Sequence, residues 1–278
     1  MVTSHQIKFP TFMYGTAWKK EATVQLVKNA ISSGFFAIDT ANQPKHYEEP
    51  LVGEALADLS RQGIGRDKFF LQTKFTPVNG QDHRIPYDPS ADLAKQVEQS
   101  FQSSLKNLHT DYVDSYLLHG PYSYPGLGDE DWEVWHAIEK IYKEGKAKFI
   151  GVSNVNPIQL QLLTEKAEIK PMIVQNRCYA IQGWDRSVRE FCKSNGVIYE
   201  GFSLLTANVP VLHDPQVEAI AKRLELTTPQ VVFLFASQIG MTPLTGTTNE
   251  QHMKEDLKAL QYQLTSDELA AIDTIAEN

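Results

Sequence analysis

The chain alternates along its length between short apolar runs and longer amphipathic stretches. The short runs are rich in β-branched and aromatic side chains and end in polar residues, a pattern that predicts buried parallel strands. We predict eight such strands: Phe12–Trp18, Phe35–Ala41, Lys68–Phe75, Asp111–His119, Ala147–Asn154, Met172–Asn176, Val197–Ser203 and Met241–Gly246.

The stretches between these strands have helical periodicity. In Ala91–Leu108, for example, Leu93, Val97, Phe101 and Leu105 recur at steps of four residues and place one apolar face toward a core. The predicted helices are Glu21–Ser33, Glu48–Arg61, Ala91–Leu108, Asp131–Glu144, one that begins at Pro157, Pro215–Glu225, Thr228–Ile239, Asn249–Ala259 and Ser266–Ala276.

Strict alternation of strands and helices predicts an α/β protein with parallel strands and right-handed crossovers. Eight units within 278 residues favour a closed (β/α)8 TIM barrel over a doubly wound sheet. A doubly wound nucleotide-binding fold would carry a Gly-x-Gly-x-x-Gly turn after its first strand, and Gly126-Leu127-Gly128 lacks the third glycine. Because no linker or repeat divides the chain, we predict a single domain over residues 1–278.

The amino-acid composition limits the binding partners and the cellular compartment that we expect for the protein. The net charge of −8 disfavours nucleic acid and anionic membranes, so we expect neither as a partner, and any anionic ligand must be met by local groups. No apolar run is long enough to cross a membrane, and Met1–Lys8 has no signal-peptide core. The two cysteines, Cys178 and Cys192, are typical of a reducing compartment. We therefore expect a cytoplasmic protein that is a monomer or a weak oligomer.

Three successive predicted strands end in chemically capable side chains, Asp39, Lys74 and His119. Each has a structural explanation when taken alone, since Asp39 could cap a helix and Lys74 could extend its amine to solvent. Together they would face one mouth, because active sites of such barrels lie at the C-terminal ends of the strands. This conjunction favours a functional site.

These residue types fit the protonation of an oxyanion. A lysine at a barrel mouth is costly unless a carboxylate pairs with it, and Asp39 can supply that carboxylate. We expect the cation to lower the pKa of a nearby phenol from about 10, so that a tyrosine becomes a usable general acid. His119 could orient a carbonyl oxygen, and the hydride would come from a cofactor.

The sequence resembles the aldo-keto reductase family over nearly its whole length. The segments that carry the resemblance are Ala37–Ala41, Leu71–Lys74, Asp114–Pro121 and Gly151–Asn154, with weaker matches at Val174–Arg177 and Gly201–Leu205. The resemblance implies a (β/α)8 barrel that reduces small aldehydes and ketones with NADPH, using an Asp-Tyr-Lys-His tetrad, with no metal.

The resemblance also implies roles for individual positions. Asp39, Lys74 and His119 match three of the four tetrad members. The matches to cofactor contacts are Ser153, Asn154 and Gln175 at the nicotinamide carboxamide, Phe202 stacked on the ring, Ser203 and Leu205 in the segment that follows, Thr245, Gly246 and Thr247 at a phosphate-contacting turn, and Glu255 and Asp256 near the adenosine. The residues expected to border the substrate are Trp18, His46 and Tyr122.

The tetrad tyrosine departs from the family pattern. Counting forward from Asp39 places Pro44 at the tyrosine position, whereas counting backward from Val52 and Gly53 places His46 there. The two counts differ because the loop carries an insertion. Tyr47 is the adjacent phenol, and the added length can absorb a shift of one residue. We predict Tyr47 as the proton donor, with His46 as the open alternative.

The basic pair that usually contacts the 2′-phosphate of NADPH is also poorly matched. Leu244 occupies a common lysine position, and Gln251 or His252 an arginine position. We expect NADPH as the cofactor, with NADH possible.

Two other functions remain open from the sequence. A barrel that binds a nicotinamide nucleotide with little catalysis, as a sensor or subunit, is favoured by the altered tyrosine motif. A metal-dependent hydrolase built on Asp39, His46 and His119 is disfavoured, because no two histidines have metal-ligand spacing on one element.

Overall fold

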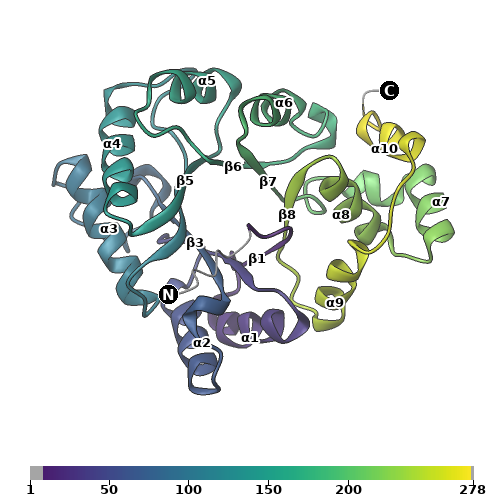
Figure 1. Ribbon diagram of the computed structural model, residues 1–278, viewed down its shortest axis with the longest axis horizontal. Coiled ribbons are helices and arrows are strands. Elements are labelled where there is room, and N and C mark those ends of the chain that lie inside the picture. The colour runs from purple at the N-terminus through teal and green to yellow at the C-terminus, as the bar shows by residue number, and fades with distance from the viewer. Residues whose placement is uncertain (1–8, 277–278) are drawn as a thin grey trace, which may run out of the picture.

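The structure is a computed structural model that describes residues 9–276, so that Met1–Lys8 and the question of a signal-peptide core lie outside it. Eight parallel strands form a closed barrel in sequence order, and the helices form a ring around it (Figure 1). The strands are β1 (Met13–Gly15), β2 (Ala37–Asp39), β3 (Phe70–Phe75), β4 (Val113–Leu118), β5 (Ala147–Ser153), β6 (Ile173–Arg177), β7 (Ile198–Phe202) and β8 (Met241–Thr245). The predicted (β/α)8 barrel is confirmed.

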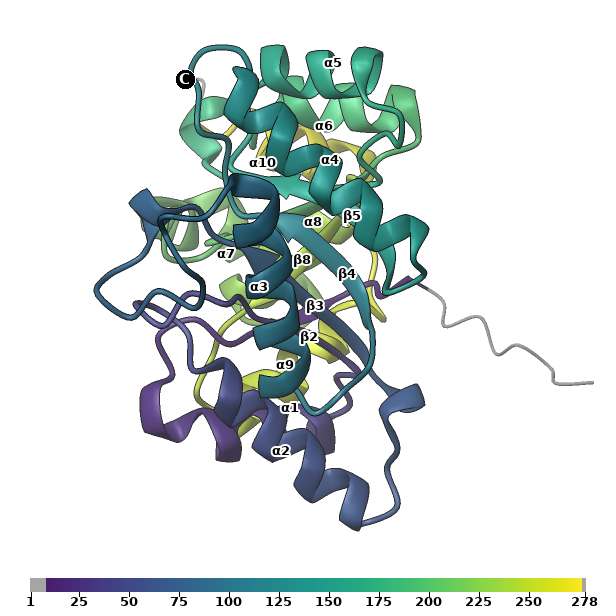
Figure 2. The same cartoon turned by 90° about the vertical axis from the view of Figure 1, so that its left-hand side faces the viewer.

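Helices connect the strands on the outside, and the strands pass obliquely between them (Figure 2). The helices are α1 (Thr23–Ser33), α2 (Glu49–Arg61), α3 (Leu93–Asn107), α4 (Asp129–Lys143), α5 (Pro157–Lys166), α6 (Arg186–Asn195), α7 (Pro215–Leu224), α8 (Thr228–Gln238), α9 (Glu250–Ala259) and α10 (Ser266–Asp273). Short 3-10 turns lie at Lys20–Ala22, Arg66–Lys68, Val78–Gly80, Ala180–Gln182 and Val209–His213. Among residues 9–276, no helix combines the length and apolarity that crossing a membrane requires.

One helix was not named from the sequence. Helix α6 is short and rich in charged residues, and only Val188 and Cys192 are fully buried in it. Its apolar stripe is too narrow to stand out from a polar loop. Most predicted strands also extend one to three residues beyond the observed strand at one or both ends. The loop residues next to the strands continue the apolar pattern, so the sequence does not mark the boundary.

Two apolar layers position the site. The larger core lies between the barrel and its helices and includes the fully buried Trp135 and Trp184. A smaller cluster inside the barrel contains Met13, Ala37 and Phe70, each the first residue of its strand. This cluster fills the N-terminal end of the barrel, so that a cavity can form only toward the C-terminal ends of the strands.

Candidate active site

A cavity of about 1000 Å³ lies at the C-terminal ends of the strands. Its lining comes from the C-terminal ends of the strands, from the loops that follow them, and from α8 and α9. The residues predicted for the site that line it are Trp18, Asp39, His46, Tyr47, His119, Ser153, Asn154, Gln175, Phe202, Ser203, Leu205, Thr245, Gly246, Thr247, Glu255 and Asp256. Lys74 and Tyr122 do not line it.

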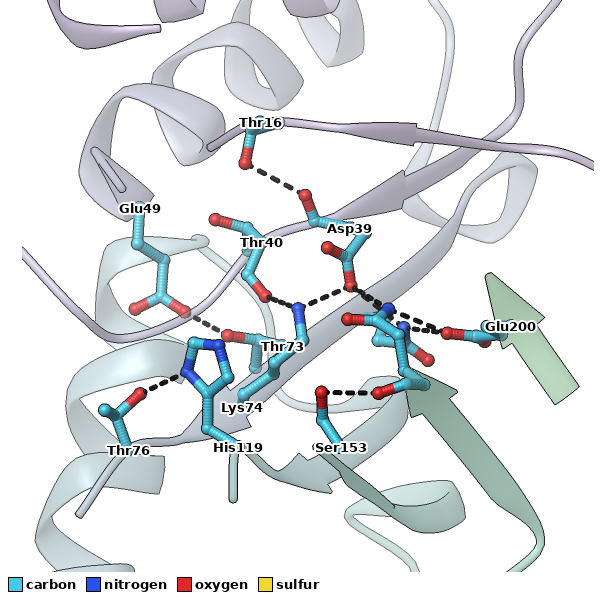
Figure 3. A network of polar contacts seen from close by, with 12 residues as sticks. Thr16, Asp39, Thr40, Glu49, Thr73, Lys74, Thr76, His119, Ser153 and Glu200 are labelled. Atoms are coloured by element: carbon cyan, nitrogen blue, oxygen red, sulfur yellow. Dashed lines mark hydrogen bonds and ion pairs between the residues drawn. The ribbon is translucent and has the colours of Figure 1, made fainter. Parts of the chain in front are cut away.

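Lys74 lies directly beneath the cavity floor and is fully buried. Its Nζ donates to Asp39 Oδ1 at 2.6 Å and to the Thr40 carbonyl oxygen at 2.9 Å (Figure 3). Burial lowers the pKa of Lys74, but Asp39 and Tyr47 outweigh it and the net pKa is raised. Lys74 is therefore a permanent cation, and the predicted Asp39–Lys74 pair is present.

The loop after β2 separates the two candidate proton donors. The backbone N–H groups of His46 and Tyr47 both donate to the Gln43 carbonyl oxygen at 2.9 Å, which forms a tight turn. Gln43 Nε2 in turn donates to the Gly80 carbonyl oxygen at 2.6 Å and fixes this turn against the loop after β3. The turn directs two consecutive side chains to different surroundings.

Tyr47 lies between the lysine and the histidine of the site. Its ring centroid is 5.5 Å from Lys74 Nζ and 6.0 Å from the His119 ring centroid. Burial raises the pKa of Tyr47 more than Lys74 lowers it, and Asp39 adds to the rise. The expectation that the cation lowers this pKa overall is therefore wrong, because desolvation of the phenolate outweighs the charge. Tyr47 remains a protonated donor at neutral pH.

His46 has a different environment. Its ring stacks on Trp18 with centroids 4.1 Å apart, and its carbonyl oxygen accepts from the Trp18 N–H at 2.7 Å. Burial and the neighbouring Lys45 lower its pKa, so that it is mostly neutral. Trp18 is 65% exposed, and the stacked pair forms an outer wall of the cavity.

The start of α2 is anchored beside the lysine strand. The Glu49 carboxylate is buried and accepts from Thr73 Oγ1 at 2.5 Å and from Asn107 Nδ2 at 3.0 Å. Because Glu49 follows Tyr47 by two residues, this anchor keeps the phenol near Lys74, the strand neighbour of Thr73. The buried carboxylate of Glu49 therefore holds the start of α2 against β3 and α3.

His119 follows β4 and faces the cavity. Its Nδ1 is 2.7 Å from Thr76 Oγ1, which leaves Nε2 for a ligand (Figure 3). Burial, Lys74 and His46 lower the pKa of His119 well below its usual range. The ring is therefore neutral at physiological pH, and a neutral imidazole retains one N–H to offer.

The three residues matched to the carboxamide lie side by side. Ser153 Oγ donates to the Gln175 carbonyl oxygen at 2.7 Å, and Asn154 Nδ2 donates to the His119 carbonyl oxygen at 2.9 Å. Gln175 Nε2 donates to Asp39 at 3.0 Å and to Glu200 at 2.8 Å, which leaves Gln175 Oε1 as a free acceptor. The Gln175 Oε1 acceptor and the Phe202 ring both line the cavity. An acceptor and an aromatic ring together are suited to bind a planar amide group.

At the opposite end of the cavity, Lys19 was missed by the sequence analysis. Its Nζ donates to the Gly246 carbonyl oxygen at 2.5 Å, and a Cβ on Gly246 would lie 3.3 Å from Nζ. Lys19 therefore sets a cation against the turn matched to phosphate contacts. Its place directly after Trp18 in the first strand-to-helix loop was the available signal, given that a chain of net charge −8 needs local cations.

The end of the cavity at α9, where the resemblance implies the adenosine, has carboxylates but few cations among the described residues. Asp256 is buried and accepts from Thr245 Oγ1 at 2.8 Å, and burial raises its pKa to about 7. His252 and Leu244 also line the cavity, and Leu244 carries no charge. Lys254 pairs with Glu250 at 2.7 Å and does not line the cavity.

Tyr122 does not lie where the sequence suggested. Its backbone N–H donates to Asp131 Oδ1 at 2.6 Å, and its ring packs against the outer core. In the part of the chain that the structure describes, Tyr122 is absent from the cavity lining, because α4 anchors the loop that carries it.

Also within residues 9–276, no three His, Cys, Asp or Glu side chains are grouped to share a metal ion, and Asp39, His46 and His119 form no such group.

Comparisons with known proteins agree with one another. The model of the Aldo/keto reductase family matches residues 7–209. The chain is 31% identical to "Uncharacterized oxidoreductase YtbE" of Bacillus subtilis, covering 98% of this chain and 91% of that protein. It is 30% identical to a glyoxal reductase of Bacillus subtilis, covering 92% and 83%. It is 31% identical to aldo-keto reductase family 1 member C2 of Homo sapiens, covering 93% and 84%.

Solved structures show the same likeness. The chain resembles MGS-M4, an aldo-keto reductase enzyme from a Medee basin deep-sea metagenome library, with a TM-score of 0.82 and 25% identity, covering 98% of this chain and 93% of that one. It also resembles an aldo/keto reductase from Brucella melitensis, with a TM-score of 0.80 and 26% identity over 96% and 95% of the two chains.

Proposed function

We propose that this chain, which belongs to the Aldo/keto reductase family, reduces the carbonyl group of small aldehydes or ketones to an alcohol with NAD(P)H. The observation that carries the proposal is the grouping of Tyr47, Lys74 and His119 around one end of the cavity. When bound, the reduced nicotinamide supplies the hydride, which no side chain of the protein can supply.

In this proposal Tyr47 is the proton donor to the carbonyl oxygen. As the carbonyl carbon receives the hydride, its oxygen becomes an alkoxide and takes the phenolic proton of Tyr47. Lys74 stabilises the phenolate that forms, and Asp39 holds Lys74 in place. The neutral His119, held at Nδ1 by Thr76, hydrogen-bonds the carbonyl oxygen and orients it.

The cofactor would lie along the long axis of the cavity. Ser153, Asn154 and Gln175 would hold its carboxamide, and Phe202 would stack on the nicotinamide ring. Ser203, Leu205 and the turn at Thr245, Gly246 and Thr247, with Lys19, would contact the phosphates, and Glu255 and Asp256 would lie near the adenosine. The substrate would enter past Trp18 and His46, because the exposed Trp18 ring borders both the cavity and the solvent.

Turnover of 4-nitrobenzaldehyde tests the proposed function. We expect oxidation of NADPH, followed by its absorbance, to depend on both the aldehyde and the protein, with the alcohol formed in equal amount. If the protein binds NADPH but reduces neither this aldehyde nor a panel of other aldehydes and ketones, the sensor function is the better one. The position of Tyr47 beside Lys74 supports reduction over the sensor, because a phenol lies near the lysine despite the altered tyrosine motif.

We expect weak discrimination between NADPH and NADH. Among the described residues that line the cavity at α9, His252 offers an imidazole and none offers a guanidinium. Each charge-assisted hydrogen bond lost to the 2′-phosphate costs roughly 1.5–3 kcal/mol. Titration of both cofactors by quenching of tryptophan fluorescence measures this, with NADPH still binding somewhat more tightly. A preference for NADPH of about a thousandfold, a difference of roughly 4 kcal/mol, would contradict it.

The preference should also fall as the pH rises. Asp256 is protonated below about pH 7 and becomes negatively charged above it, because burial raises its pKa to about 7. The new charge would repel the 2′-phosphate, which NADH lacks. We expect the ratio of the dissociation constants for NADH and NADPH to move toward unity between pH 6 and 8. The Asp256→Asn variant should not show this change, and its affinity for NADH should stay the same across this pH range.

A further inference from the structure

Beneath the cavity, two buried carboxyl groups are joined by two side-chain amides. Gln72 Nε2 donates to Asp39 Oδ1 at 2.9 Å and to Glu200 Oε2 at 2.7 Å. Gln175 Nε2 donates to the same two oxygens at 3.0 Å and 2.8 Å. In Figure 3 the unlabelled side chains between Asp39 and Glu200 carry these bonds. All four residues are less than 4% exposed, so water does not screen them.

This arrangement couples Asp39 to Glu200. An amide nitrogen has two hydrogens, and in both glutamines one hydrogen is directed to each carboxyl group. Each amide therefore bridges the two carboxyl groups, so that a charge gained on Glu200 acts on Asp39 over a short distance that contains only protein atoms. Because Asp39 Oδ1 also accepts from Lys74 Nζ, the effect reaches the lysine beside Tyr47.

The charges around Glu200 are unbalanced. Asp39 faces it from β2 and Lys74 from β3, while β6 presents the neutral Gln175 and β8 places Thr242 beside it in register. One lysine thus faces two carboxyl groups. Burial and Asp39 raise the pKa of Glu200 to about 7, against the opposing effects of Gln72, Gln175 and Lys74. The folded protein therefore holds this proton through the acidic range and loses it near neutral pH.

The hydrogen bonds favour Oε1 over Oε2 as the oxygen of Glu200 that carries the proton. Glu200 Oε2 accepts from both amides, whereas Glu200 Oε1 is buried and has no hydrogen-bond partner among the described residues. Negative charge on Oε1 would have no compensating donor in that part of the chain, which is costly in an apolar interior. A proton on Oε1 removes that cost.

We propose that Glu200 is a positioning residue for the carbonyl reduction: by gaining or losing its proton it sets the acidity of Tyr47, through the Gln72 and Gln175 amides, Asp39 and Lys74. The inference rests on the proposed function for its effect on rate, but the effect on Tyr47 stands independently. With Glu200 neutral, Lys74 is less offset by negative charge and Tyr47 is the stronger acid. With Glu200 charged, Tyr47 is the weaker acid and reduction slows.

The test compares the pH dependence of reduction in the wild type and in Glu200→Gln, which has the same shape but no charge. We expect kcat of the wild type to fall up to about tenfold as the pH rises through 7, the change that one pKa unit in Tyr47 would give. In Glu200→Gln this inflection should disappear, with KM little changed. Glu139→Gln is the matched control, because Glu139 is a buried glutamate on α4, far from the barrel interior, and should keep the wild-type profile.

The ionisation of Tyr47 gives a readout that does not need turnover. The alkaline rise in tyrosinate absorbance, taken as the difference between each protein and its Tyr47→Phe counterpart, should occur at lower pH in Glu200→Gln than in the wild type. If Glu200→Gln does not fold, Gln72→Met serves instead: it removes a hydrogen bond that lowers the pKa of Glu200, so the inflection in kcat should move to higher pH.

Either of two results would overturn the inference. One is an inflection near pH 7 that persists unchanged in Glu200→Gln, which would assign it to another group. The other is an equal loss of kcat at every pH with an unchanged Tyr47 titration, which would mean a structural role only. If no protein turns over any carbonyl, the proposed function fails, and the Tyr47 titration still decides this inference.

Discussion

Lys74→Met is expected to lower kcat for carbonyl reduction by about 10²–10⁴-fold, the usual contribution of positioned acid–base catalysis. Lys74 is the cation in contact with Asp39 and the one nearest the Tyr47 ring, and methionine fills its volume without charge. Without it, the phenolate that forms as Tyr47 gives up its proton would face Asp39 unshielded. Steady-state reduction of 4-nitrobenzaldehyde at saturating NADPH measures the loss.

The same substitution should leave the fold and cofactor binding in place but lower the stability. Lys74 is fully buried, so its removal leaves Asp39 as an unpaired charge, and breaking such a pair costs about 3–5 kcal/mol. Circular dichroism and a cofactor titration separate these effects from the loss of rate. Lys106→Met, an exposed lysine on α3, is the control for loss of a lysine. Turnover of Lys74→Met near the wild-type rate would refute the assigned site.

Tyr47→Phe is expected to lower kcat by a similar factor, because it removes only the hydroxyl group that gives the proton. The ring remains between Lys74 and His119, so that packing and cofactor binding should be unchanged. His46→Ala should mainly raise KM, since His46 supports Trp18 at the entrance. Measurement of kcat and KM for both variants with one aldehyde separates the two residues.

The opposite result would reverse the assignment. If Tyr47→Phe keeps most of the turnover and His46→Ala loses it, the imidazole is the acid and the stacking on Trp18 must be broken during catalysis. A double variant with the rate of the slower single variant would show that both side chains act in one step.

Substitutions at the cofactor end of the cavity are expected to change function less than substitutions at the catalytic end. Exchange of one cation at the 2′-phosphate changes affinity by one or two hydrogen bonds, whereas in the proposed mechanism Lys74 and Tyr47 act on the reacting atoms. This difference explains why a chain of this family can depart from the usual basic pair and still keep the geometry around Asp39.

The order of the strands and the residues at their ends could be predicted from the sequence. Strands β3 and β4 are buried on both faces, and Lys74 near the end of β3 and His119 directly after β4 stand out by their polarity. Parallel strands in a barrel bring all their C-terminal ends together, and that rule alone placed Asp39, Lys74 and His119 near one another.

The tertiary structure decided what depends on contacts between distant segments. The different surroundings of Tyr47 and His46 follow from a turn held by Gln43 against Gly80, 37 residues away, which no local pattern reveals. The absence of Tyr122 from the cavity lining also has a tertiary cause, because Asp131 on α4 accepts a hydrogen bond from the Tyr122 backbone N–H and holds its loop.

Electrostatics inside the barrel was the other matter that only the tertiary structure decided. The sequence shows that Lys74 is cationic, but the pKa of Tyr47 depends on how completely the phenol is buried, and burial outweighs the charge. Gln72 and Glu200 appear in the sequence as isolated polar residues in apolar strands. Their role follows only when closure of the barrel brings β2, β3, β6 and β7 together around Asp39, because hydrogen bonds across a barrel join residues as far apart as 136 positions in the chain.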